Sequence, residues 1–202
     1  GEGDQGENSG GVGSYSSKPW FTRKTENELI TIMEKLIKSL ADNGNQFRGM
    51  VYGGFVLTAE GPKLIEVNAR PGDPETQVIL PRMRSKLLPI LQQSSAGWFE
   101  VTSLEWDRRV AVCVVLCSEG YPGKPVINRP IHGLNEIPTD VLVFHAGTGL
   151  NENGEVITSG GRVLSVVALG DTLEQARVRV YEAIKCIKFE GMYYRRDIAD
   201  NV

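Results

Sequence analysis

The feature that most constrains this chain is an uninterrupted apolar run, rich in β-branched residues, that starts after Arg109 and ends at Cys117. Such a run is typical of a buried strand. A final amphipathic segment, from about Thr172 to Ile187, places its apolar side chains at helical spacing, with Asp171 or Thr172 as N-cap. Together with several shorter strand patterns, these segments predict an α+β fold with mainly antiparallel strands.

The first half of the chain divides into a loop, a helix, a hairpin and a second helical segment. The helix is expected to begin with Thr25 as N-cap and Glu28 as its capping-box partner, and to stop at Gly44. The second helical segment is interrupted near Pro81, and a kink is expected at Pro89. The expected ranges are 1–19 for the loop, 25–40 for the helix, 49–69 for the hairpin and 76–93 for the second helical segment.

A break in the pattern within 94–106 predicts a domain or subdomain boundary. Beyond the buried strand, residues 118–138 contain several Gly and Pro and have no clear period. A short strand is expected at 141–146. Residues 155–158 and 163–169 are expected to pair as a hairpin around Ser159-Gly160-Gly161.

Composition excludes several classes of protein. With 202 residues, 41% hydrophobic and 23% charged, the chain is neither a coiled coil nor disordered. The net charge of −3 gives no reason to expect a nucleic-acid or membrane surface. No run reaches the ~18 apolar residues of a membrane span. Three cysteines without a C-x-x-C pattern favour free thiols in a reducing compartment, so we expect a cytoplasmic protein.

The sharpest chemical pattern is Glu66-x-Asn68, which lies in the second strand of the expected hairpin. Residues two apart on a strand point to the same face, so a carboxylate and an amide oxygen lie side by side. Both are oxygen ligands of the kind that Mg²⁺ takes together with water and nucleotide phosphate. Arg70 follows, and a guanidinium beside a metal stabilises charge on a transferred phosphoryl group.

Three further features have both a chemical and a structural interpretation. Asp73 is either a base or substrate ligand, or the cap of a helix that begins near Pro74, and the two roles are compatible. The Gly-rich stretch from Asn8 to Gly13 either presents backbone N–H groups to an anion or is only flexible. Arg162 is either an anion ligand at a turn or a solvent-facing side chain. His132 and His145 have no nearby acid or nucleophile and are expected to be structural.

Several of these segments resemble one known family, glycinamide ribonucleotide synthetase (phosphoribosylamine–glycine ligase). The first carriers are the loop from Gly3 to Tyr15 and the block Glu66-Val-Asn-Ala-Arg-Pro-Gly-Asp-Pro-Glu-Thr-Gln-Val-Ile-Leu-Pro81. Later pieces occur in the family's order: Glu119-Gly-Tyr-Pro-Gly123, Phe144-His-Ala-Gly-Thr148, Thr158-Ser-Gly-Gly-Arg-Val-Leu164 and Tyr194-Arg-Arg-Asp-Ile198.

The resemblance implies an ATP-grasp fold followed by a small mixed α/β C-terminal domain. Residues 1–98 would be the C-terminal part of the ATP-grasp domain, on its metal and substrate side, and 99–202 the C-terminal domain. It also implies a reaction of de novo purine biosynthesis, in which glycine is joined to 5-phosphoribosylamine while ATP is cleaved to ADP and phosphate. Glycine is first phosphorylated to glycyl phosphate, and the amine then displaces the phosphate.

The resemblance also assigns the site residues. Glu66 and Asn68 are the expected ligands of Mg²⁺ or Mn²⁺, and Arg70 and Asp73 the expected catalytic residues. Substrate binding is expected from Asn8, Ser9, Gly10, Gly11 and Gly72. This chain departs from the family pattern at Glu7, Ser9, Val12 and Pro71, and none of these changes removes a candidate ligand.

The family's chain is about twice as long, and the present one opens without Met inside a Gly-rich loop. We therefore expect a fragment that lacks the N-terminal half of the same protein, its expected partner, and that is inactive alone. Two alternatives stay open: a different ATP-grasp ligase that shares the metal strand, and a non-catalytic fragment that binds a partner through an exposed apolar surface.

Overall fold

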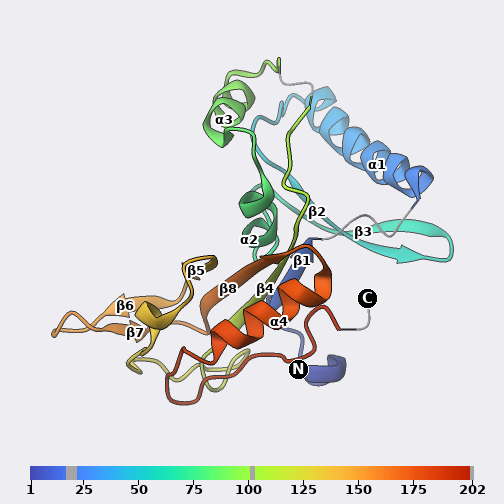
Figure 1. Cartoon of the computed structure of the whole chain (residues 1–202). Helices are drawn as coiled ribbons and strands as arrows, with labels where there is room; N and C mark the ends of the chain where they lie inside the picture. Colours follow the sequence, from blue (N-terminus) through green and yellow to red (C-terminus); the bar gives the residue numbers. More distant parts are fainter. Residues whose placement is uncertain (17–21, 101–102, 201–202) are drawn as a thin grey trace. The chain divides into compact units, whose positions relative to one another are not determined.

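The computed structural model describes residues 1–16, 22–100 and 103–200 (Figure 1). The chain forms two compact units, and each is described by itself. The first consists of Gly1–Ser17, Asp73–Arg82 and Asp107–Val202, and the second of Lys18–Gly72 and Met83–Trp106. The chain thus passes between the units several times, and the division at residue 98 that the resemblance implies stays a prediction.

The first unit is built on a four-stranded antiparallel sheet with strand order β1-β4-β8-β5. The central strands pair along their length, from Val110 opposite Gly170 to Leu116 opposite Leu164. The expected α+β class with mainly antiparallel strands is confirmed. The strands are β1 (Gly13–Ser16), β4 (Val110–Cys117), β5 (Val141–His145) and β8 (Arg162–Gly170).

Every residue of β4 is buried, as the apolar run predicts. Its side chains alternate between two clusters: one contains residues of α4 (Leu173–Ile184), the other contains Val78 of α2 (Thr76–Ile79). Because both faces of the strand meet apolar structure, apolar residues occupy every position of β4, which explains the missing alternation. Figure 1 shows α4 lying along the sheet. The four residues facing α4 are Val110, Val112, Val114 and Leu116.

The last helix, α4, begins after Thr172, whose hydroxyl accepts a hydrogen bond from the backbone N–H of Gln175 at 3.2 Å. Thr172 is therefore the N-cap, one of the two residues that the sequence allowed. Its buried residues recur at the i, i+4, i+7 and i+8 spacing of one helix face. They are Ala176, Val180, Ala183 and Ile184.

The opening segment corrects one prediction. Residues 1–19 were expected to form only a loop, but Gly13–Ser16 is strand β1, and Glu2–Asp4 is a short 3₁₀ turn. Strand β1 pairs with β4, with Gly13 opposite Val114. Its partner lies about a hundred residues further along the chain, so no local period marks it. Residues 17–19 of the expected loop lie outside the described residues.

The hairpin expected between 155–158 and 163–169 is wrong. Strand β7 (Val156–Thr158) pairs with β6 (Thr148–Leu150) in a small sheet of its own. Strand β8 pairs with β4 on one side and β5 on the other. From Val163 onward β8 is buried, so it gains more from a central place in the sheet than from its nearest neighbour in sequence.

The second unit contains the hairpin of β2 (Tyr52–Thr58) and β3 (Gly61–Asn68), as predicted, and helix α1 (Arg23–Asp42). The N-cap of α1 is Thr22, whose hydroxyl accepts a hydrogen bond from the Thr25 N–H, so Thr25 lies inside the helix rather than capping it. None of the described helices is both long and apolar enough to cross a membrane.

The helical segment expected over 76–93 is two helices in different units. Helix α2 passes into a 3₁₀ turn, Leu80–Arg82, that contains Pro81, and α3 (Leu87–Ala96) starts anew. Pro89 lies in the first turn of α3, where no backbone N–H is required. The expected kink therefore has no cause at Pro89.

The two units differ in how they bury apolar residues. Among the described residues, all buried hydrophobic side chains belong to the first unit. In the second unit Ile65 is 69% exposed, Leu88 65% and Phe99 59%. A core like that of the first unit does not form in the second from the residues described.

Helix α4 offers a matched pair of substitutions. Val180 is fully buried and Val178 is 53% exposed on the same helix. Val180→Ala removes two methyl groups from the core and leaves a cavity, so we expect a loss of about 2 kcal/mol in the free energy of unfolding. Val178→Ala should change it by less than about 0.5 kcal/mol. Urea denaturation monitored by circular dichroism measures both, and equal losses would contradict the packing described.

The buried thiols give a second prediction. Burial raises the pKa of Cys113 to about 12 and that of Cys117 to about 11, whereas Cys186 is half-buried. Iodoacetamide at pH 8 should modify Cys186 in the native protein and all three thiols in urea. Because the native state keeps thiol protons that the unfolded chain loses, stability should fall as the pH rises above about 9 towards these pKa values. Rapid native labelling of Cys113, detected by peptide mass spectrometry, would refute this assignment.

Candidate functional site

The Gly-rich stretch from Gly3 to Gly13, called the opening loop below, lies close against Pro74, just before α2, and against Tyr121. A Cβ atom on Gly11 would lie 2.3 Å from Cδ of Pro74, and one on Gly10 would lie 2.9 Å from the Tyr121 hydroxyl. No side chain fits at Gly11 without a backbone shift. The two glycines therefore serve close packing, which decides against a merely flexible loop. Asn8 and Ser9 precede them on the exposed part of the loop.

Arg162, at the start of β8, ties this loop to Asp73. Its Nη1 donates to the carbonyl oxygens of Gly11, at 3.0 Å, and of Asp73, at 3.2 Å. Its Nη2 donates to Oδ2 of Asp73 at 2.8 Å. The guanidinium has the planar, forked geometry that holds several oxygens in fixed positions. Arg162 is thus not a solvent-facing side chain: it joins three chain segments of the first unit.

Asp73 is held at both carboxylate oxygens, because Oδ1 accepts a hydrogen bond from the Gln77 side chain at 3.1 Å. The N-cap of α2 is Glu75, which makes no side-chain capping bond, so the interpretation of Asp73 as a helix cap is wrong. The hydroxyl of Ser14 also donates to the carbonyl of Pro74 at 2.7 Å. Asp73 is therefore a fixed, partly exposed negative charge beside the backbone of Gly11.

Glu66 and Asn68 form a second group of candidate residues, in the second unit. They alternate along β3, so both side chains project from one face, as predicted. Gly54 lies opposite Glu66 in the pairing, and a Cβ there would lie 2.7 Å from Cγ of Glu66. The absence of a side chain at Gly54 leaves room for the glutamate. Glu66 is exposed and Asn68 half-buried, so both oxygen donors are accessible.

Two oxygen donors fit a Mg²⁺ ion that takes its other ligands from water and phosphate. Within the described part of the chain, no group of three or more His, Cys, Asp or Glu side chains is placed to hold a metal. The pair on β3 is suited to a metal that arrives with a nucleotide.

The remaining residues that the sequence singled out are Arg70, Gly72 and His145. Arg70 is exposed, and its Nη1 donates to the carbonyl of Pro71 at 2.8 Å. Gly72 is buried. His145 contacts Thr148 Oγ1 through Nδ1 at 3.0 Å. The loop, Asp73 and Arg162 come together in the first unit, whereas Glu66, Asn68, Arg70 and Gly72 belong to the second.

The family models and the curated relatives that match this chain name one enzyme. Residues 1–76 match a model described as "Phosphoribosylglycinamide synthetase, ATP-grasp (A) domain", and residues 111–201 match the C domain of the same enzyme. The chain is 44% identical over 199 residues to the phosphoribosylamine–glycine ligase of Caldanaerobacter subterraneus and 42% identical over 198 residues to that of Halalkalibacterium halodurans. In both alignments 98% of this chain is covered. The chain spans about half the length of these relatives, 47% and 46%.

Solved structures agree. The crystal structure of phosphoribosylamine–glycine ligase from Thermotoga maritima superposes with a TM-score of 0.85 at 33% identity, covering 98% of this chain and 48% of that one. A biotin carboxylase domain from Hydrogenobacter thermophilus, solved with MgADP and bicarbonate, gives a TM-score of 0.64 at 15% identity over 91% of this chain and 40% of its own. At that identity the second match concerns the fold alone. The expected ATP-grasp fold is confirmed.

The close approach of the loop to Pro74 can be tested by substitution. Gly11→Ala should cost about 1–3 kcal/mol of unfolding free energy, because its Cβ overlaps a proline ring. Gly149→Ala in β6 is the control, since its Cβ would meet nothing nearer than 3.9 Å. Urea titration of both variants provides the comparison. Equal stability of the two would mean that the loop does not pack on Pro74.

Proposed function

We propose that this chain, which belongs to the phosphoribosylglycinamide synthetase family, is the C-terminal half of a phosphoribosylamine–glycine ligase. The complete protein would join glycine to 5-phosphoribosylamine in purine biosynthesis and cleave ATP to ADP and phosphate. The observation that carries the proposal is the pair Glu66 and Asn68 on one accessible face of β3. A scaffold that had lost its chemistry would have no need to keep these oxygen donors together.

Glu66 and Asn68 are the residues that would hold Mg²⁺ or Mn²⁺ with the phosphates of ATP. When bound there, the metal would offset negative charge on the transferred phosphoryl group. Arg70, two residues further along the chain, adds a second positive charge for the same purpose. The MgADP in the biotin carboxylase neighbour supports a nucleotide with magnesium in this fold.

The loop and Asp73 are proposed to bind the small substrates. Backbone N–H groups along Asn8–Gly11 suit an anion, such as the carboxylate of glycine or a phosphate. Asp73 provides a fixed negative charge for an amino group, and buried Gly72 keeps its backbone close. Phosphorylation of glycine's carboxylate gives glycyl phosphate. The amine of phosphoribosylamine then forms the C–N bond as phosphate departs. Holding both substrates in place is the main contribution of these residues.

The exposed apolar residues of the second unit support a missing partner. Ile65 and Val67, on β3, are 69% and 44% exposed, and Ile30 on α1 is 48% exposed. An apolar groove on α1 is lined by Leu29, Ile30, Met33, Glu34, Ile37, Lys38 and Ala41. We propose that the remaining half of the ligase covers these surfaces, so that the chain is inactive alone. The same surfaces favour the alternative, a non-catalytic fragment that binds a different partner.

We also propose a cytoplasmic location, because the three cysteines are free thiols, as expected in a reducing compartment. The alternative of a different ATP-grasp ligase that shares the metal strand differs from the proposed glycine ligase in its carboxylic acid substrate. Assaying a panel of carboxylic acids that contains glycine separates these two activities.

The ligase proposal is tested by phosphate release from ATP with Mg²⁺, glycine and phosphoribosylamine. The chain alone should release no phosphate, and its mixture with the upstream half of the protein should release phosphate. Glu66→Gln should lower the rate of the mixture about 100-fold or more, because losing a metal ligand costs several kcal/mol. Glu60→Gln, at the hairpin turn beside Lys63, is the matched control and should be neutral. If the two halves are shown to associate but their mixture releases no phosphate, the partner-binding alternative is favoured.

A further inference from the structure

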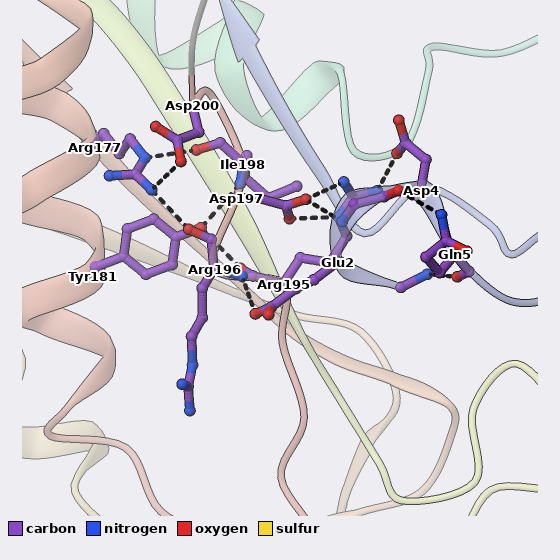
Figure 2. A network of polar contacts seen from close by, with 12 residues as sticks. Glu2, Asp4, Gln5, Arg177, Tyr181, Arg195, Arg196, Asp197, Ile198 and Asp200 are labelled. Atoms are coloured by element: carbon purple, nitrogen blue, oxygen red, sulfur yellow. Dashed lines mark hydrogen bonds and ion pairs between the residues drawn. The ribbon is translucent and has the colours of Figure 1, made fainter.

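The two ends of the described chain meet in a polar network, shown in Figure 2. The carboxylate of Asp197 accepts a hydrogen bond from the backbone N–H of Gly3 at 2.8 Å. Nη1 of Arg195 donates to Oδ1 of Asp4 at 2.9 Å, and the backbone N–H of Arg196 donates to the Glu2 carboxylate at the same distance. Residues more than 190 positions apart are thus joined by three contacts, all within the first unit.

Arg195 and Asp197 also bind each other. The Nε–Oδ1 distance is 2.7 Å and the Nη2–Oδ2 distance is 2.5 Å, so the guanidinium and the carboxylate meet side by side at two points. Their side chains are only 19% and 26% exposed. The hydrogen-bonded guanidinium of Arg195 holds the pKa of Asp197 well below its usual range, which favours the charged carboxylate. The pair is a preformed clamp for the backbone N–H of Gly3 and the carboxylate of Asp4.

The segment that carries this pair is fixed to α4. The hydroxyl of Tyr181 donates to the carbonyl of Arg195 at 2.8 Å and accepts from the N–H of Ile198 at 3.2 Å. Arg177 donates to the carbonyls of Arg196, at 2.7 Å, and of Ile198, at 3.1 Å (Figure 2). Because Tyr181 itself packs against the core cluster that contains the buried residues of α4, the segment is held by the rigid sheet and helix.

The same segment also reaches the far end of the loop. A Cβ atom on Gly13 would lie 2.5–2.9 Å from three side-chain atoms of Ile198. Gly13 begins β1, so this contact lies where the loop enters the sheet. Residues 195–198 therefore hold the loop at Gly3–Asp4 and at Gly13. Between these points lies Asn8–Gly11.

We propose that Arg195, Asp197 and Ile198 are positioning residues that hold both ends of the opening loop, so that its backbone N–H groups are arranged before substrate arrives. The proposal rests on the proposed function of that loop. Fixing the two ends removes part of the conformational freedom that the loop would otherwise lose on binding. The motif Tyr194-Arg-Arg-Asp-Ile198 thereby acquires a role, although none of its residues is proposed to touch substrate.

Amide hydrogen exchange tests the clamp without requiring activity. We expect Asp197→Asn and Asp4→Asn to raise exchange of the hydrogen-bonded loop amides of Gly3 and Asp4 about tenfold and to leave β4 and β8 unchanged. Asn suits position 4, because Asp4 has φ of 58° and Asn tolerates positive φ as Asp does. Asp140→Asn, which breaks the surface ion pair with Arg179 in the same unit, is the matched control. Unchanged loop exchange in both test variants would overturn the proposal.

Asp4→Asn protects the test against a folding defect. The Asp4 side chain is 88% exposed and packs on no core residue, so this variant should fold even if Asp197→Asn does not. If β4 also exchanges freely in Asp197→Asn, the result for Asp4→Asn decides alone.

A second measurement separates this proposal from that of the ligase. In the complete ligase, both variants should raise KM for glycine or phosphoribosylamine several-fold with a smaller effect on kcat, because the loop must be ordered on binding. Faster loop exchange with unchanged KM would overturn the positioning role and leave the ligase assignment intact. If the complete wild-type protein forms no product, the proposed function fails, and with it the role of the loop in binding.

Discussion

The pairing of β4 with β8 is the interaction on which the described structure most depends. Both strands are buried along nearly their whole length, and their antiparallel ladder carries apolar side chains to two faces. One face is closed by α4 and the other by the short helix α2. Arg162 is the first residue of β8, so this ladder fixes the position from which Arg162 binds Asp73 and the loop. The position of Arg195 also depends on this ladder, because the Tyr181 hydroxyl of α4 donates to the Arg195 carbonyl and α4 packs on the sheet.

The sequence predicts those parts of the fold whose signal is local. The run ending at Cys117, the hairpin up to Asn68 and the final helix each have a period or turn that is complete within about twenty residues. The errors lie where a distant partner decides. Gly13–Ser16 becomes a strand only because β4 accepts it, and β7 pairs with β6 because β8 is taken up by the main sheet.

The same distinction applies to the candidate site. Glu66 and Asn68 follow from strand alternation and were predicted to share a face. Arg162 was placed only as one of two interpretations, because nothing in its surroundings points to Asp73, 89 residues earlier. Its one signal was the preceding Gly160-Gly161, where a Cβ on Gly161 would lie 2.4 Å from the ring of Tyr121. The helix-cap interpretation of Asp73 failed because the N-cap of α2 is Glu75, and the Asp73 carboxylate binds the side chains of Arg162 and Gln77 instead.

The placement of β1 has a consequence for biosynthesis. During synthesis, Gly13–Ser16 emerges from the ribosome about a hundred residues before the strand that pairs with it. Gly3 and Asp4 must wait longer still, until residues 195–197 have left the exit tunnel. The β1–β4 pair can therefore close only after β4 has emerged, and the loop only after residues 195–197 have emerged. Such high contact order slows folding, and a nascent chain stalled before residue 110 would expose the opening segment without a partner.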